Sequence, residues 1–165
     1  MDYTAHYDSP LGGITLASDG EKLVGLWFDG QKYFAGTLGK EHEDGTDLEI
    51  FDMTHRWLDI YFSGHAPNFT PPLQMRTTDF RKRVWEIMLT IPYGQTMTYG
   101  DIARIIVRER GLASMSAQAV GSAVGHNSIS LIIPCHRVVG RGGSLTGYAG
   151  GIDKKVRLLK MEGVV

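Results

Sequence analysis

Three prolines between residues 67 and 72 divide the chain into two parts of different character. Proline fixes φ and lacks a backbone N–H, so neither a helix nor an inner strand continues through Pro67, Pro71 and Pro72. The segment shows no hydrophobic periodicity, which is typical of a linker. We therefore expect two small domains, residues 1–72 and 76–165, in this chain of 165 residues.

The two parts also differ in charge. Residues 1–75 hold four basic and twelve acidic side chains, a net charge of −8, whereas residues 76–165 hold thirteen basic and six acidic ones, a net charge of +7. A basic domain is typical of proteins that bind polyanions, most simply nucleic acid. We expect a nucleic-acid-binding C-terminal domain carried on an acidic N-terminal scaffold.

The first part predicts a small α/β domain. Short β-prone runs at Tyr3–Tyr7, Gly13–Ser18 and Leu23–Phe28 are separated by turn residues, as in an antiparallel three-stranded sheet. Residues 31–45 are polar and contain glycines, which predicts a loop with at most a short helix. Apolar residues recur at helical spacing from about Asp47 to Phe62 and predict a helix there.

The second part predicts a mainly helical domain. Thr77 or Thr78 can cap its first helix, Thr98 with Asp101 approximates a capping box for the second, and Ser116 can cap the third. The second and third helices form a helix-turn-helix candidate. Small residues along the third helix would allow a close approach to a DNA groove.

The C-terminal segments predict a loop and a helix. The glycine-rich stretch from Val138 to Tyr148 is typical of a wing or a flexible loop. A last helix is expected from about Ile152 to Glu162, with Ile152, Val156 and Leu159 facing inward.

The only cysteine, Cys135, lies on a predicted turn. Pro134 ends the apolar run Leu131–Ile133, and His136 and Arg137 place two potential cations beside the sulfur. Such neighbours favour the thiolate over the free thiol, whose pKa is about 8.5. An isolated cysteine is often an inert buried residue. A cysteine, a histidine and a distant carboxylate can, however, together form an activated nucleophile.

The same composition excludes several other classes of site. A single cysteine excludes an internal disulfide and a thiolate-rich metal site, and it fits a reducing cytoplasm. The six histidines lack metal-ligand spacing, so we expect no metal. No apolar run approaches the roughly 18 residues of a membrane span, and the first residues do not resemble a secretory signal.

Glu162 falls in the last turn of the final predicted helix, where a carboxylate faces the negative end of the helix dipole. Two explanations stay open at this point: it pairs on the surface with Arg157 or Lys160, or it orients His136 as the third member of a triad orients its base. Neighbouring side chains on a turn point apart, so a bridging water would carry the proton between Cys135 and His136. The hypothesis is a Cys–His–Glu relay.

The stretch Pro134–Val139 resembles the active-site signature of the methylated-DNA–protein-cysteine methyltransferases, also called alkylguanine-DNA alkyltransferases. The resemblance covers nearly all of residues 77–163, with matching spacing throughout. The further matching segments are Ile91–Gly94, Thr98–Tyr99, Ala119–Gly121, Asn127, Gly147–Gly151 and Glu162. The N-terminal part adds only a compatible order of strands and helix.

The resemblance implies an α+β fold. Its N-terminal domain would be ribonuclease-H-like, with a small antiparallel three-stranded sheet and a helix. Its C-terminal domain would be mostly helical and winged-helix-like, would bind DNA and would carry the active-site cysteine.

The resemblance also implies DNA repair without a cofactor. The protein would bind double-stranded DNA containing alkylated guanine through the minor groove and flip the damaged base into a pocket. The cysteine would take the alkyl group from the 6-oxygen of guanine, irreversibly and once per molecule. We expect a monomer; repair of the 4-oxygen of thymine and cooperative binding along DNA stay open.

Roles for individual residues follow from the same resemblance. Cys135 would be the acceptor, His136 the water-mediated base and Glu162 its orienting partner, while Tyr99 would rotate a phosphate beside the flipped base and Asn127 would brace the turn. Tyr148 would stack on the base, and the Val138 carbonyl would accept from the guanine amino group. The substrate and DNA contacts together would comprise Gln118, Ala119, Gly121, Ser122, Arg137, Val138, Tyr148 and Ala149.

Three departures from the family pattern stand out. Gln118 replaces an arginine that often fills the gap left by the flipped base, and an amide lacks the charge and stacking plane of a guanidinium. Ala149 replaces a serine that often donates near the 6-oxygen, which predicts an altered substrate preference or rate. The link around Val107–Ala113 is about five residues longer than in the family, which predicts a different local turn between the two helices.

Three other functions are weaker explanations of the sequence. A non-enzymatic lesion-binding protein of the alkyltransferase-like type would lack the acceptor cysteine, whereas Cys135 is present. A winged-helix transcription regulator would leave Pro134–Val139 and Glu162 without a use. A cysteine hydrolase would need an oxyanion site, for which nothing in the chain argues.

Overall fold

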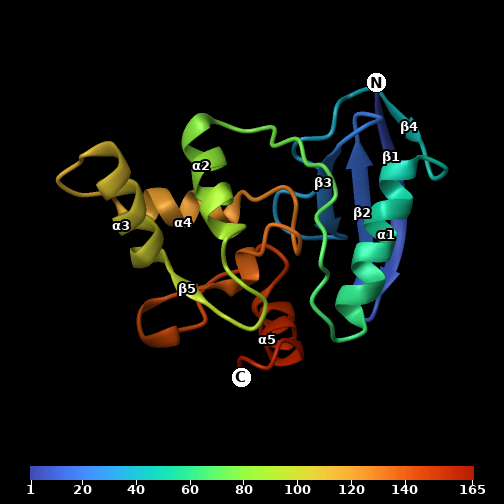
Figure 1. The fold of residues 1–165 in the computed structure, drawn as a ribbon. Helices are drawn as coiled ribbons and strands as arrows, with labels where there is room; N and C mark the ends of the chain where they lie inside the picture. Colours follow the sequence, from blue (N-terminus) through green and yellow to red (C-terminus); the bar gives the residue numbers. More distant parts are fainter. The chain divides into compact units, whose positions relative to one another are not determined.

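The computed structural model describes all 165 residues, which separate into two compact units (Figure 1). Unit 1 comprises Met1–Arg76 together with Ser128–Ile132, and unit 2 comprises Thr77–Asn127 together with Ile133–Val165. None of the helices combines the length and the apolar character that a membrane span requires.

Unit 1 is built on a four-stranded sheet with the order β3-β2-β1-β4. The three expected antiparallel strands are confirmed as β1 (Asp2–Ser9), β2 (Gly12–Ser18) and β3 (Leu23–Phe28). The expectation of only three strands is wrong, because β4 (His42–Asp44) pairs in parallel with β1. This edge strand has three exposed polar residues and therefore none of the alternation that marks a strand in a sequence.

Helix α1 (Glu49–Phe62) packs against β1 and β2 (Figure 1). It buries an apolar face that includes Phe51, Leu58 and Tyr61, as its helical spacing predicts. A further buried cluster is formed by Ala17, Val24 and Trp27 and is covered by two residues of the following loop, Ala35 and Leu38. Together these contacts form the core of unit 1.

The outer edge of β3 is covered by two segments from elsewhere in the chain. Leu23 donates its N–H to the Pro72 carbonyl at 2.8 Å and accepts from Gln74 at 2.9 Å. Leu26 is bonded in the same way to Ser128 and Ser130. Covering an edge removes a row of unpaired backbone groups. Because Ser128 and Ser130 pair with β3, the segment Ser128–Ile132 groups with unit 1. The domain boundaries expected from the sequence had placed these residues in the second domain.

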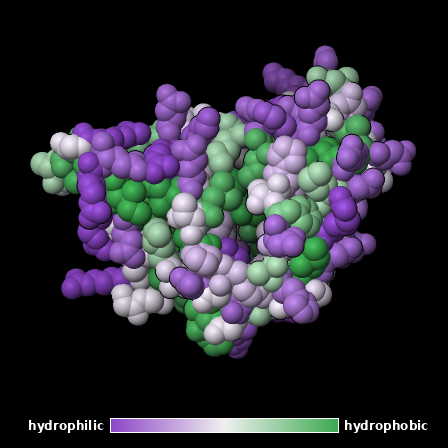
Figure 2. Space-filling model, viewed as in Figure 1, coloured by the Kyte–Doolittle hydropathy of each residue, from purple (hydrophilic) through white to green (hydrophobic).

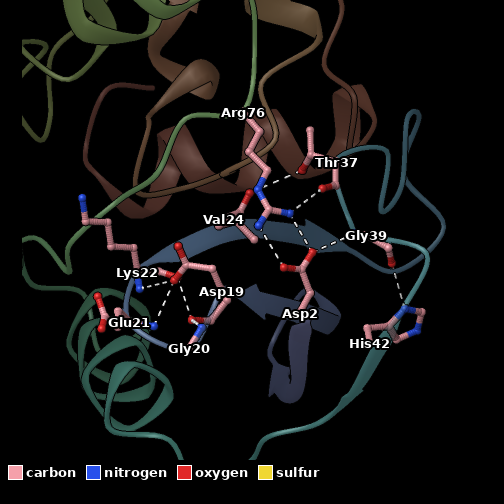
Figure 3. A network of polar contacts seen from close by, with 11 residues as sticks. Asp2, Asp19, Gly20, Glu21, Lys22, Val24, Thr37, Gly39, His42 and Arg76 are labelled. Atoms are coloured by element: carbon pink, nitrogen blue, oxygen red, sulfur yellow. Dashed lines mark hydrogen bonds and ion pairs between the residues drawn. The ribbon is translucent and has the colours of Figure 1, made fainter.

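An ion pair between Asp2 and Arg76 joins the two ends of the first segment of unit 1 (Figure 3). Arg76 donates from both terminal nitrogens to the Asp2 carboxylate, at 2.6 and 2.8 Å, and also to the Thr37 carbonyl at 3.1 Å. The Gly39 N–H donates to the same carboxylate at 2.7 Å. The Arg76 guanidinium is the main cause that lowers the pKa of Asp2 to about 2.

Replacing Asp2 by Asn should lower the free energy of unfolding by about 1–3 kcal/mol at pH 7, because Arg76 loses its charged acceptor. A lowered carboxyl pKa stabilises the folded state above the pKa of the unfolded chain, near 4, and this stabilisation disappears as the pH falls toward 2. Urea denaturation at pH values from 7 down to 2 measures both effects, with the exposed Asp8→Asn on the same strand as control. A difference that stays constant over this range would contradict the assignment.

Unit 2 contains four helices: α2 (Asp79–Met88), α3 (Tyr99–Arg110), α4 (Ala117–Gly125) and α5 (Ile152–Met161). α4 packs against both α2 and α3. The indole N–H of Trp85, on α2, donates to the Ala123 carbonyl of α4 at 2.8 Å. The expected helix-turn-helix pair, α3 and α4, is therefore fixed on a buried support.

The three expected N-caps are confirmed. Thr78 accepts a hydrogen bond from the Arg81 N–H, and Ser116 accepts one from the Ala119 N–H. Thr98 and Asp101 form both bonds of a capping box at the start of α3.

Part of the segment Val138–Tyr148, for which a wing or flexible loop was expected, has regular structure. Cys135–Arg137 form a 3₁₀ turn, η1, and β6 (Val138–Val139) follows it and pairs in parallel with β5 (Met97–Thr98). A second 3₁₀ turn, η2, spans Arg141–Gly143. Two-residue strands lie below the length at which a sequence pattern identifies them.

Of the three residues predicted to face inward on α5, Leu159 is buried, whereas Val156 is half-buried and Ile152 is exposed. Ile152 is 40% exposed, whereas Lys155, Leu158 and Leu159 are buried and Glu162, which directly follows the helix, is also buried. Positions 155, 158, 159 and 162 have the spacing of one helix face. Apart from Leu159, this face was not predicted, because a charged residue stands at each of its ends.

Candidate active site

Cys135 begins the turn η1 and is 5% exposed. Burial raises the pKa of its thiol above the ordinary value, and this effect is opposed by hydrogen bonds from Asn127 and Tyr148 and by the charge of Lys155. The net shift is the opposite of the one expected from cations beside the sulfur, because burial outweighs the groups that favour the thiolate. One of these groups is Lys155, which the sequence pattern did not single out.

Glu162 is the centre of a buried polar cluster. Its carboxylate accepts from His136 Nε2 at 2.6 Å, from Arg137 Nε at 2.8 Å and Nη2 at 3.2 Å, and from the Gly94 N–H at 3.0 Å. Of the two explanations left open by the sequence, the structure therefore places Glu162 against His136. Although burial raises the pKa of Glu162, the hydrogen bonds from His136, Arg137 and Gly94 bring it to about 2.

The geometry defines the protonation of His136. The ring is completely buried, and burial lowers its pKa, with a smaller opposing effect from Glu162. An ionised carboxylate only accepts hydrogen bonds, so Nε2 must be the donor to Glu162. A neutral His136 then has its lone pair on Nδ1, which is the nitrogen that can take up a proton.

Arg137 lies in the interior and not on a DNA-binding surface. It is 8% exposed, grips Glu162 with two nitrogens and donates from Nη1 to the Ile91 carbonyl at 2.8 Å. A direct DNA contact, for which the sequence had suggested it, would require breaking these bonds. The fork geometry instead orients the carboxylate that holds His136.

The turn Ile91–Gly94 serves the same cluster through its backbone. Gly94 has φ of 81°, a conformation that favours glycine, and a Cβ added there would lie 3.3 Å from the Glu162 carbonyl oxygen. Its N–H reaches the Glu162 side chain only because the chain passes this closely. The match of Ile91–Gly94 to the family pattern thus has a physical basis.

Asn127 links the end of α4 to the cysteine turn. Its side-chain amide donates to the Ile133 carbonyl at 2.8 Å, and the same side chain hydrogen-bonds the Cys135 sulfur. Asn127 and Ile133 flank the excursion Ser128–Ile132 that belongs to unit 1. The Asn127 side chain therefore joins the two ends of the segment Ser128–Ile132 and also positions the Cys135 sulfur.

A hollow of about 520 Å³ lies beside α4 and brings together three of the remaining predicted residues, Tyr99, Gln118 and Gly121. Its lining is formed by Tyr99, Gly100, Ala117, Gln118, Gly121, Arg141 and Thr146. The pairing of β5 with β6 fixes the start of α3, and with it Tyr99, next to the segment that follows Cys135.

The face of α4 that carries Gln118, Ala119 and Ser122 is exposed, while Tyr148 and Ala149 are half-buried. The surface over α3 combines hydrophobic residues with hydrophilic ones around them (Figure 2), and Arg104 and Arg108 are exposed on this helix. The predicted DNA-contact residues other than Arg137 and Val138 are thus at least partly accessible from outside. Val138 is buried, so only its backbone is offered to a ligand.

Comparison with known families gives two matches. A profile described as "6-O-methylguanine DNA methyltransferase, ribonuclease-like domain" matches residues 3–75, and one described as "6-O-methylguanine DNA methyltransferase, DNA binding domain" matches residues 79–164.

Individual relatives cover almost the whole chain. The methylated-DNA–protein-cysteine methyltransferase of Mycobacterium tuberculosis is 44% identical over 160 residues, which cover 95% of this chain and 92% of the relative. The inducible enzyme of Bacillus subtilis is 36% identical over 162 residues, 98% of this chain and 85% of the relative. The crystal structure of Mycobacterium tuberculosis OGT in complex with DNA aligns with a TM-score of 0.83 at 41% identity, over 97% of this chain and 92% of that chain.

Replacing Glu162 by Gln should lower the free energy of unfolding by about 3–5 kcal/mol, because Arg137 would be left buried without its counter-charge. The control is Glu109→Gln, which breaks an exposed, solvent-screened ion pair with Arg83 and should lower the stability far less. Urea denaturation at pH 7 measures both values. If the two variants lose the same stability, Glu162 is not the buried centre described above. Adding Arg137→Met to the Glu162 variant should recover part of the loss.

Proposed function

The chain belongs to the 6-O-methylguanine DNA methyltransferase family, and we propose that Cys135 is the residue through which it acts. The protein repairs alkylated DNA by direct transfer of the alkyl group to itself, and DNA is its partner. The observation that carries the assignment of the acceptor is the position of the only cysteine, buried on a turn and hydrogen-bonded by Asn127 and Tyr148.

The transfer is a displacement at the alkyl carbon. A lone pair of the Cys135 thiolate forms the new sulfur–carbon bond while the bond between this carbon and the guanine 6-oxygen breaks. The electron pair of the broken bond stays on the oxygen, and the guanine ring gains one proton as the thiol loses one. The thioether has no route back to a thiol, so each molecule acts once.

A buried thiol of raised pKa needs a base before it can attack. His136 supplies it: Glu162 holds the Nε2 proton, so Nδ1 takes the thiol proton through a water molecule. Tyr99 donates to the flipped base and turns the neighbouring phosphate. These roles make Cys135 and His136 the reacting groups and Glu162 a positioning residue.

DNA would meet the exposed face of α4 through the minor groove. The small residues Ala119, Gly121 and Ser122 let the helix approach closely, and Gln118 occupies the gap left by the flipped base. Tyr148 stacks on the base within the pocket. A protein that keeps a free nucleophilic thiol works best in a reducing compartment, so we place it in the cytoplasm.

Mixing the protein with excess duplex that contains one 6-O-methylguanine should raise its mass by one methyl group, mapped to the peptide of Cys135. The gain should stop at one methyl per molecule, and Cys135→Ala should bind the duplex without any gain. Intact-mass and peptide mass spectrometry measure both. Tight binding by the native protein without a mass gain would indicate the lesion-binding alternative, and a methyl on another residue would overturn the role of Cys135.

Gln118→Arg should raise the affinity for duplex DNA more than twofold, because a guanidinium adds charge and a stacking plane where the base has left. Gln74→Arg, at an exposed position of unit 1, adds the same charge as a control. Fluorescence anisotropy with a labelled duplex at fixed salt gives both affinities. An increase below twofold, or one matched by the control, would count against the proposal that Gln118 occupies the gap left by the flipped base.

A further inference from the structure

Lys155 is a wholly buried lysine in unit 2. Lysine is among the residues that are almost never fully buried unless they are paired. Its Nζ donates to the carbonyls of Val138 at 2.6 Å, Thr146 at 3.1 Å and Gly147 at 3.2 Å. The ammonium group has three N–H donors, and each has one acceptor.

These acceptors belong to two separate segments. Val138 begins β6, directly after the cysteine turn, whereas Thr146 and Gly147 precede Tyr148 in the loop that leads to α5. The Lys155 side chain therefore connects the segment Thr146–Tyr148, called the pocket wall below, to the strand β6 that follows the cysteine turn.

The charge of Lys155 has no carboxylate partner among these contacts, since all three acceptors are neutral carbonyls. Burial lowers the pKa of Lys155, and the only opposing effect comes from Cys135. In the same way, the charge of Lys155 is among the effects that lower the pKa of Cys135. The buried cation and the reactive sulfur are thus each other's electrostatic partners.

We propose that Lys155 is a positioning residue for alkyl transfer, which fixes the pocket wall to β6 and supplies the positive charge that faces the Cys135 thiolate. The inference rests on the proposed function and adds to it a residue outside the Cys–His–Glu relay. The hydrogen bonds of Lys155 to Thr146 and Gly147 affect how the base is bound, whereas its ammonium charge affects the ionisation of the Cys135 thiol. The two effects are separable by experiment.

Other ionisable groups surround the sulfur and must stay constant in the test. Tyr148 comes from the loop before α5, His136 and Arg137 come from η1, and Glu162 follows α5. A substitution at Lys155 leaves these side chains in place, but it also removes a charge that lowers the pKa of His136. A shift in the pH dependence of the thiol then reports the lost ammonium charge, both directly and through His136.

The test compares Lys155→Met with Lys160→Met, which removes an exposed lysine from the same helix. Two reactions of Cys135 are followed between pH 6 and 10: alkylation by iodoacetamide, which needs only a thiolate, and methyl transfer from duplex DNA with one 6-O-methylguanine. In Lys155→Met, iodoacetamide alkylation should be slower by about tenfold at pH 7, equivalent to a rise of about one unit in the thiol pKa, and should match the native rate at high pH. Methyl transfer should be slower by at least about tenfold even at high pH, because the wall is no longer fixed.

Two results would overturn the proposal: an unchanged iodoacetamide pH profile, or a methyl-transfer rate at high pH equal to that of the native protein. If Lys155→Met does not fold, Lys155→Gln provides the same test, because its amide keeps donors for the wall but has no charge. It should show the shifted iodoacetamide profile with a smaller loss of methyl transfer at high pH. If the native protein takes no methyl from the duplex, the proposed function fails, while the iodoacetamide profiles still decide the role of the charge.

Discussion

The buried carboxylate of Glu162 is the interaction on which the active site depends. Its hydrogen-bond donors are His136 and Arg137 on the cysteine turn and Gly94 on the turn after α2. A buried charge that loses its partners destabilises the folded state by several kcal/mol. Separating the cysteine turn or the turn after α2 from Glu162 therefore has a high free-energy cost. The same carboxylate determines which ring nitrogen of His136 carries the proton. Structure and proton transfer therefore rely on one side chain.

Helix α5 organises the site at both ends of one face. Lys155 and Glu162 lie seven residues apart, two helical turns, with Leu158 and Leu159 buried between them. The leucines fix the helix in the core, and the two charged residues reach the wall of the pocket and the base. Because burial raises the pKa of the Cys135 thiol even with Lys155 in place, the thiol needs a base before it can attack.

Much of the fold was predictable because it rests on local signals. The caps at Thr78, Thr98 and Ser116, the main strands and the order of the helices follow from patterns within a few residues. β4, β5 and β6 were missed because strands of two or three residues carry no periodicity. The buried face of α5 was predicted correctly only at Leu159, because apolar character alone was used to define it. The residues of the candidate site were found from their chemistry and from the family resemblance, but the interior position of Arg137 and the involvement of Lys155 depend on tertiary packing.

The protonation state of His136 tests this account most directly. Nitrogen NMR of protein labelled with ¹⁵N-histidine distinguishes the two neutral tautomers and the charged ring, and a His136→Gln variant assigns the signal among the six histidines. The account predicts a neutral ring with its proton on Nε2 from pH 6 to 8, because burial lowers the pKa and the ionised Glu162 accepts from Nε2. A charged ring at pH 7, or a neutral ring with its proton on Nδ1, would contradict it, since neither form has a lone pair on Nδ1 to receive the proton of Cys135.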